Sequence, residues 1–245
     1  MTQLTLSLDP APNRAGAINS FTTTGRAHVP SILTDASAKN LHTAITDLEH
    51  WNAIFDRDGQ NVDLNDSALS ILTDVQKTAL LGHLSQTAAT GFQYFFANIP
   101  LYDAYHSGRE IDPRLTAIYE FINGEAFLNQ CRALTGMNGI TFADAQLTRY
   151  GPGQFLTRHN DDVDGKNRLA AYVLNLTPDW RTEWGGTLEF YDAAGNVVQG
   201  FTPTFNALNL FRVPQSHAVT YVTPFAQGYR YAITGWLRSG TDPKG

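Results

Sequence analysis

The second half of the chain consists of short β-prone runs at close intervals. After Gly136, segments rich in Thr, Val, Tyr and Phe are separated by Gly-Pro, Gly-Gly and Thr-Pro-Asp breaks. Many short strands with such punctuation are typical of a sandwich or jelly-roll. The runs predict strands near residues 140–150, 154–160, 168–176, 186–191, 206–212, 216–223 and 229–238.

The first half has the opposite character, and residues 26–136 are expected to form mainly helical support for the β core. A short strand is predicted over residues 26–33, and a helix over residues 38–55 that Asp35 or Ser37 would cap. Thr73 and Gln76 form a capping-box pattern. It opens a predicted helix that ends near Pro100, with one buried stripe formed by Leu80, Leu84, Ala88, Gly91 and Phe95.

A third predicted helix runs from Pro113 to Gly136 and can break in two at Asn123-Gly124. Residues 1–25 show no sustained period and are expected to be a lead-in, whose few β-prone residues can add an edge strand. Together, the predicted helices and strands indicate an α+β fold in one domain, residues 1–245, with residues 137–240 as its β core.

Composition narrows the function classes. At 42% hydrophobic and 16% charged residues the chain is expected to fold. A formal charge of −6 without any basic run argues against nucleic acid as a partner. The sequence has no apolar run of membrane-spanning length and no leader pattern, so we expect a cytoplasmic protein without a membrane partner. Cys131 is the one cysteine, which excludes a disulfide framework and any multi-cysteine metal site.

Three side chains form a candidate metal site. His159 and Asp161 lie two residues apart, and in an extended strand such positions face the same side. His217 would add a second imidazole from a later strand. Two histidines and one carboxylate leave three coordination positions open, as in non-haem Fe(II) oxygenases. Asp162 and Asp164 are weaker ligand candidates.

Arg230 is the second feature with chemical meaning. Strand alternation would place Arg230, Thr234 and Trp236 on one face. A buried guanidinium needs a partner and fits a carboxylate through two parallel hydrogen bonds, which favours a dicarboxylate ligand. Tyr150 precedes His159 by nine residues and could present its hydroxyl to the same cavity.

Together these motifs resemble the prolyl-hydroxylase branch of the Fe(II)- and 2-oxoglutarate-dependent oxygenases. The matching residues, which cover roughly 138–238, are Tyr150-Gly151-Pro152-Gly153, His159-x-Asp161, Trp184-Gly185-Gly186-x-Leu188, Pro203 with Asn206, His217-x-Val219 and Arg230-x-x-Ile233-x-Gly235-Trp236.

The resemblance implies a double-stranded β-helix that holds Fe(II) through His159, Asp161 and His217. It also implies 2-oxoglutarate and O2 as cosubstrates, with the distal carboxylate of 2-oxoglutarate on Arg230 and ascorbate allowed as a reductant. Tyr150 matches a cosubstrate-contacting tyrosine, Thr234 and Trp236 match pocket-lining positions, and Tyr172 is a looser match. The implied reaction couples decarboxylation of 2-oxoglutarate to succinate and CO2 with C–H hydroxylation, in many members of a prolyl residue in a protein.

Two alternatives stay open at this point. The substrate can be a free amino acid or another small molecule instead of a protein, and residues 100–112 and 161–167 would decide between them. From another class, a jelly-roll protein that binds metal without turnover has the same ligands. The sequence leaves the oligomeric state undetermined. The aromatic cluster Phe92, Tyr94, Phe95 and Phe96 is interpreted as core packing, and His28, His42, His50, His83 and His106 as non-ligands.

Overall fold

The computed structural model describes residues 4–10 and 14–244. Helices occupy mainly the first half of the chain: α1 Ala15–Thr24, α2 Asp35–Thr46, α3 Asp66–Ser70, α4 Asp74–Ala88, α5 Leu101–Tyr105, α6 Pro113–Asn123, α7 Glu125–Thr135 and the short 3-10 helix Thr182–Trp184. No helix in the described ranges combines the length and the hydropathy that a membrane span requires.

Strands occur in both halves. They are β1 Arg26–Val29, β2 Asn52–Arg57, β3 Gln60–Leu64, β4 Tyr94–Ile99, β5 Phe142–Ala143, β6 Gln146–Tyr150, β7 Phe155–His159, β8 Arg168–Asn175, β9 Leu188–Tyr191, β10 Val197–Phe201, β11 Ala207–Arg212, β12 His217–Val219 and β13 Arg230–Arg238. Each of the seven strands predicted after Gly136 overlaps an observed strand, but the predicted strand 140–150 is divided into β5 and β6 and the predicted strand 216–223 is shortened to β12. Strand β10 was not predicted.

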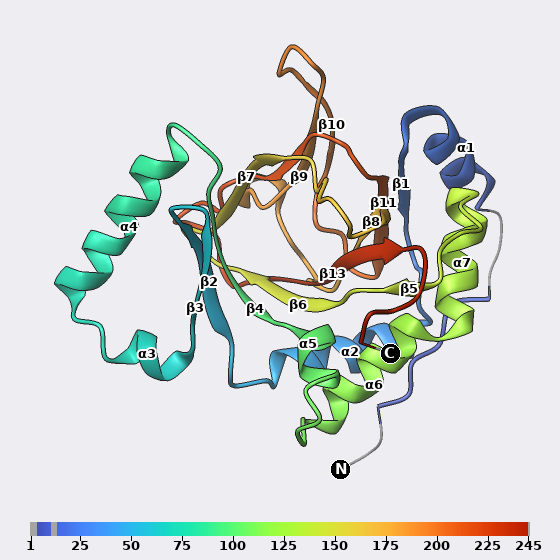
Figure 1. Cartoon of the computed structure of the whole chain (residues 1–245), viewed down its shortest axis with the longest axis horizontal. Coiled ribbons are helices and arrows are strands. Elements are labelled where there is room, and N and C mark those ends of the chain that lie inside the picture. Colours follow the sequence, from blue (N-terminus) through green and yellow to red (C-terminus); the bar gives the residue numbers. More distant parts are fainter. Residues whose placement is uncertain (1–3, 11–13, 245) are drawn as a thin grey trace.

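The strands form a nearly closed antiparallel barrel, the double-stranded β-helix (Figure 1). Neighbours follow the order β1-β11-β8-β13-β6-β4-β7-β12-β9-β10, with β2 and β3 attached through β4 and with β5 attached to β13. Because β8, β13 and β6 are adjacent while β7, β12 and β9 form the facing group, side chains from both groups can meet inside the barrel.

Helices α1, α2, α5, α6 and α7 cover one side of this barrel, as predicted, while α3 and α4 lie at its other end beside β2 and β3 (Figure 1). The main apolar core lies between the covering helices and the barrel. Its fully buried members include Phe21, Leu41, Ile118, Phe127 and Leu174. Burial of a large apolar side chain contributes about 1.5–3 kcal/mol to the free energy of unfolding, so this layer is the main interaction that holds the helices against the barrel.

Several local predictions are confirmed. The capping box of Thr73 and Gln76 starts α4, Pro113 is the first residue of α6, and the helix breaks at Gly124 into α6 and α7. Gly136 ends α7 in the left-handed conformation with φ of 70°. This conformation has little steric cost for glycine because it lacks a Cβ atom. Cys131 is fully buried and unpaired.

Two helix predictions were too long. The helix predicted to Phe55 ends at Thr46, is capped by Thr34, and is followed by β2. The helix predicted to Pro100 ends at Ala88, is followed by β4, and buries only Leu84 among its described side chains. Trp51 and Phe55 have helical spacing, but β2 is held by pairing to both β3 and β4.

The Asp58-Gly59 turn of the β2–β3 hairpin has positive φ at both residues (55° and 80°). This is the Asp-Gly signal of a two-residue hairpin. Residues 15–24 of the expected lead-in form helix α1. Among its described residues, 4–10 and 14–25, no strand forms and Leu8 makes an isolated β-bridge to Leu33; residues 1–3 and 11–13 lie outside the described part of the chain.

Candidate metal centre

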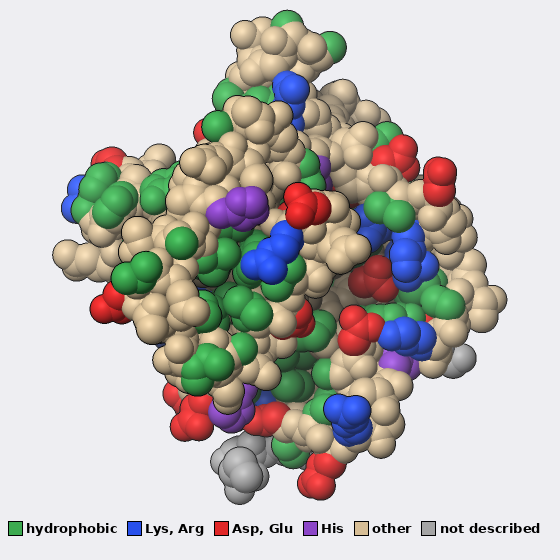
Figure 2. All heavy atoms as spheres, turned by 60° about the vertical axis from the view of Figure 1, so that its left-hand side comes forward, with side chains coloured by type: hydrophobic (Ala, Val, Ile, Leu, Met, Phe, Trp, Pro, Cys, Tyr) green, Lys and Arg blue, Asp and Glu red, His purple; other side chains and the backbone are tan. Residues whose placement is uncertain are grey.

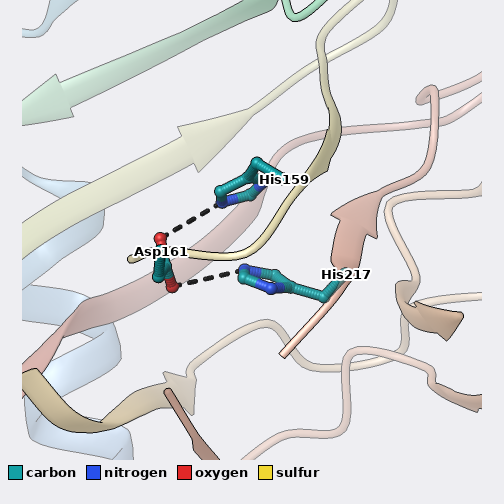
Figure 3. Close-up of side chains that lie close together, drawn as sticks. All are labelled: His159, Asp161 and His217. Carbon is teal, nitrogen blue, oxygen red and sulfur yellow. Dashed lines mark ion pairs between the residues drawn. The ribbon is translucent and has the colours of Figure 1, made fainter. Parts of the chain in front are cut away.

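The structure brings His159, Asp161 and His217 together at the mouth of the barrel (Figure 3). The Nε2 atom of His159 lies 3.2 Å from Oδ1 of Asp161, and Nε2 of His217 lies 3.4 Å from Oδ2 of the same carboxylate. One ligand atom from each residue falls within 4.8 Å of the others. All three side chains are largely buried, with exposures of 18%, 8% and 5% for His159, Asp161 and His217.

Strand pairing sets the two imidazoles side by side. His159 is the last residue of β7 and His217 the first of β12, and the two are register partners with ring centroids 4.1 Å apart. Asp161 reaches them differently from the prediction. Strand β7 ends before it, and its backbone is left-handed with φ of 64°. Its carboxylate therefore faces the histidines through a turn of the backbone and not through strand alternation. A left-handed aspartate is uncommon and often marks a functional position.

Main-chain carbonyls orient both imidazoles. The Nδ1 of His159 bonds the carbonyl of Thr157 at 3.0 Å, and the Nδ1 of His217 bonds that of Gln215 at 2.7 Å. A carbonyl only accepts, so each Nδ1 carries a proton, and each Nε2 faces the carboxylate of Asp161. Outer hydrogen bonds of this type fix the tautomer of metal-ligating histidines.

Charge states also suit a divalent metal. Burial, with a smaller contribution from nearby His159, lowers the pKa of His217 to about 4, so its imidazole is neutral at physiological pH. Burial alone would raise the pKa of Asp161, but the hydrogen bond with His159 and the two adjacent histidines hold it below its usual value. Two imidazole nitrogens and one carboxylate oxygen are a donor set for a non-haem Fe(II) site with open positions.

Arg230 lies deeper in the same pocket. It is 2% exposed, its Nε has no hydrogen-bond partner within the described ranges, and burial lowers its pKa. The ring centroid of its register partner Tyr150 lies 5.2 Å from the guanidinium carbon. Burial raises the pKa of Tyr150, so its phenol stays protonated. A buried guanidinium with an unused donor fits a carboxylate supplied by a ligand.

The predicted pocket residues line one cavity of about 270 Å3. Besides the three candidate ligands, its walls include Arg230, Tyr150, Thr234 and Trp236. Tyr172 also lines it, but its hydroxyl donates to the carbonyl of Asp144 and is not free for a ligand.

The aromatic cluster on β4 is not simple core packing, contrary to the sequence interpretation. Phe92, Tyr94 and Phe96 line the pocket, and Phe92 is 48% exposed with its ring centroid 5.6 Å from that of His159. The ring of Phe96 stacks on Tyr150 at 4.7 Å. Their i, i+2, i+4 spacing is the strand signal that a helical interpretation of this segment concealed.

The other titratable candidates lie elsewhere. His28 bonds Asn209, His42 bonds a main-chain carbonyl, and His106 bonds Tyr119. Asp162 and Asp164 are exposed. Across residues 4–10 and 14–244, no other group of three His, Cys, Asp or Glu side chains has ligand spacing.

Comparisons with known proteins agree with this geometry. Residues 145–238 match the family model described as 2OG-Fe(II) oxygenase superfamily. The chain is 29% identical over 133 residues to the mouse (Mus musculus) protein named prolyl 3-hydroxylase OGFOD1, which covers 51% of this chain and 24% of that protein. It is 32% identical over 101 residues to the Xenopus laevis protein of the same name, covering 38% of this chain and 19% of the other. The chain thus spans about a quarter or less of these curated relatives.

A solved structure has the same fold. It is the Trichoplax adhaerens prolyl hydroxylase in complex with a peptide fragment of the hypoxia inducible factor oxygen degradation domain. The superposition has a TM-score of 0.60 at 17% identity and covers 91% of this chain and 87% of the other.

Proposed function

Because the chain belongs to the 2OG-Fe(II) oxygenase superfamily, we propose that it is an Fe(II)- and 2-oxoglutarate-dependent hydroxylase that acts on a prolyl residue in a protein. The observation that carries the proposal is Arg230, a buried cation that has no carboxylate partner among the described residues and lies in the same pocket as the three candidate metal ligands. A jelly-roll protein that binds metal without turnover would gain nothing from such an arginine, because burial of this cation without a ligand is unfavourable.

Each residue then has a task. His159, Asp161 and His217 would hold Fe(II), and Arg230 with the neutral hydroxyl of Tyr150 would orient 2-oxoglutarate. Iron and 2-oxoglutarate with O2 supply the oxidising power for C–H hydroxylation, while 2-oxoglutarate leaves as succinate and CO2. The protein needs no acid or base for that step, so its residues bind, orient and exclude water.

The aromatic walls of the pocket support an apolar target group. Apolar atoms make up most of the lining of this pocket. Phe92, Tyr94 and Phe96 are among its wall residues, and the ring centroid of Phe92 lies 5.6 Å from that of His159. A saturated ring such as that of proline fits such a surface. The names of the curated relatives, prolyl 3-hydroxylases, also favour a prolyl substrate.

The test is anaerobic titration of the metal-free protein with Fe(II) and 2-oxoglutarate, which needs no substrate. We expect the visible charge-transfer band of the iron–2-oxoglutarate chelate at one equivalent of each. The band should vanish in His217→Ala and persist in His83→Ala, which removes an exposed histidine from α4. Failure of the wild-type protein to form the band would exclude the proposal. If it forms, 2-oxoglutarate turnover with ascorbate present then identifies substrates among prolyl peptides.

A further inference from the structure

A second, larger cavity opens beside the metal pocket. It measures about 570 Å3 and shares four wall residues with the metal pocket: Gln146, Thr234, Gly235 and Trp236. Thr234 and Gln146 are register partners on β13 and β6, so the common wall is part of the barrel itself. Figure 2 shows a recess on this side of the molecule with hydrophobic side chains along one edge and charged side chains of both signs along the other.

The second cavity is rich in positive charge. Its walls carry four cations, Lys166, Arg168, Arg238 and Lys244, but only two carboxylates, Asp103 and Asp144. Two of the cations are already paired. The Nη1 of Arg238 lies 3.1 Å from Asp144, and Nζ of Lys244 lies 2.5 Å from Asp103.

Lys166 and Arg168 are the remaining two cations. Within the described parts of the chain, neither forms an ion pair with a carboxylate. The main chain of Lys166 accepts a hydrogen bond from Nε of Arg238 at 2.6 Å, which brings this second positive group to the same wall. The four cations outnumber the two carboxylates of this cavity, and an anion placed beside Lys166 and Arg168 reduces the repulsion between them.

Arg168 lies between this cavity and the metal centre and contacts residues of both. Its Nη1 donates to the main-chain carbonyl of Asp161 at 2.9 Å, and its guanidinium carbon lies 3.5 Å from the ring centroid of Trp236. Stacking and the hydrogen bond hold the group in place, yet its buried Nε has no partner in the described structure. A guanidinium that is partly buried, held in place and left with an unused donor can bind a carboxylate with little loss of conformational freedom.

We propose that this second cavity binds a carboxylate group of the substrate, held by Lys166 and Arg168 while the target carbon lies in the aromatic pocket next to the metal. The inference rests on the proposed function, because it assigns the anion to the molecule that also enters the metal pocket. Lys166 and Tyr102 with Asp103 come from residues 161–167 and 100–112, the two segments expected from the sequence to select the substrate.

The free donors on this wall match a carboxylate. Asp103 and Asp144 already pair with Lys244 and Arg238, so Lys166 and Arg168 remain for the ligand, and a planar guanidinium binds the two oxygens of a carboxylate through parallel hydrogen bonds. A carboxylate can belong to an acidic side chain near the target residue or to the end of a short chain. Both sources present the same planar pair of oxygens to Arg168.

The experiment uses the full-length, metal-free protein labelled with 15N, so it does not depend on iron chemistry. The reporter is the indole N–H signal of Trp236, one of only four tryptophans, assigned with Trp236→Phe. Four probes are titrated to millimolar concentration. They are N-acetyl-aspartate methylamide, its neutral counterpart N-acetyl-asparagine methylamide, N-acetylglycine and inorganic phosphate.

We expect a saturable shift with at least one carboxylate probe and none with the asparagine compound. The dissociation constant should rise about tenfold in Arg168→Gln and severalfold in Lys166→Gln. It should not change in Lys77→Gln, which removes an exposed lysine from α4. Tighter binding of the aspartate probe assigns the carboxylate to a side chain, and tighter binding of N-acetylglycine assigns it to a chain end.

Several results would overturn the proposal. They are equal shifts with the aspartate and asparagine probes, tighter binding of phosphate, or unchanged affinity in Lys166→Gln and Arg168→Gln. If Arg230→Gln abolished binding while Lys166→Gln and Arg168→Gln did not, the anion would lie in the metal pocket, and this result would also refute the proposal. Absence of the iron–2-oxoglutarate band with these shifts intact would instead refute the proposed oxygenase function and leave an anion site.

Discussion

Replacing Arg230 with methionine separates ligand binding from folding more clearly than any other single change. Arg230 is 2% exposed, its Nε has no hydrogen-bond partner among the described residues, and its guanidinium carbon lies 5.2 Å from the ring centroid of Tyr150. Replacing the guanidinium removes the cost of burying an unpaired charge and also removes a cation–π contact. These two effects change the free energy of unfolding in opposite directions, each by about 1–2 kcal/mol. We expect the free energy of unfolding of Arg230→Met to stay within about 1 kcal/mol of wild type, or to increase.

Binding of 2-oxoglutarate should change far more. A bidentate carboxylate pair on Arg230 comprises two charge-assisted hydrogen bonds worth about 1.5 kcal/mol each. Loss of about 3 kcal/mol corresponds to roughly a 150-fold higher dissociation constant. Urea unfolding measures the first quantity. Anaerobic calorimetric titration of the Fe(II)-loaded protein with 2-oxoglutarate measures the second.

Arg132→Met is the matched control. Arg132 lies on α7, donates from Nε to the carbonyl of Ile140 at 2.8 Å and pairs with the exposed carboxylate of Glu125. Its loss should cost about 1 kcal/mol of stability and leave the 2-oxoglutarate affinity unchanged. A destabilised Arg230→Met that still binds 2-oxoglutarate like wild type would show that Arg230 is a structural cation, and the reasoning would fail.

Four further outcomes follow from the structure. Tyr150→Phe should raise the 2-oxoglutarate dissociation constant about fivefold by calorimetry without changing the melting temperature, because the buried phenol loses only its hydroxyl. Fe(II) at a hundred times its dissociation constant should stabilise the wild type by about 2.7 kcal/mol in urea and leave His217→Ala unaffected. Asn206→Ala should lose about 2–3 kcal/mol in the same assay, since the buried amide bonds the main chain on both its donor and its acceptor side. Gly235→Ala should fold poorly or lose about 3 kcal/mol or more by thermal melting, because a Cβ there would lie 1.9 Å from the carbonyl oxygen of Asp144.

The β half of the fold was predictable because its signals are local. Breaks such as Gly151-Pro152-Gly153 end strands by their own backbone preferences, and alternation along β13 places Arg230, Thr234 and Trp236 on the pocket side whatever surrounds them. The prediction for the helical half was wrong where the local residue pattern fits both a helix and a strand. Trp51 and Phe55 have helical spacing, but residues 52–55 pair with β4, some forty residues away, and this pairing decides for a strand.

The metal site shows the same limit. The residues His159, Asp161 and His217 were identified from their types and spacing, but the reason for their convergence was not. The positive φ of Asp161 and the hydrogen bond from Arg168 to its carbonyl depend on a turn and a neighbouring strand that no local pattern encodes. The aromatic wall was missed for a related reason, since Phe92 and Tyr94 have their role only once β4 joins the barrel.

The arrangement around Asp161 links the two cavities physically. Its carboxylate faces the histidines while its carbonyl is held by Arg168, so one left-handed residue lies between the metal centre and the cationic cavity. The loop after Asp161 returns through Gly165 to Lys166 on the wall of the second cavity. An anion bound by Lys166 and Arg168 would therefore contact the same guanidinium that donates a hydrogen bond to the main-chain carbonyl of the metal ligand Asp161. Substrate charge and metal-site geometry would then be coupled across a single residue, with no requirement for a larger movement of the barrel.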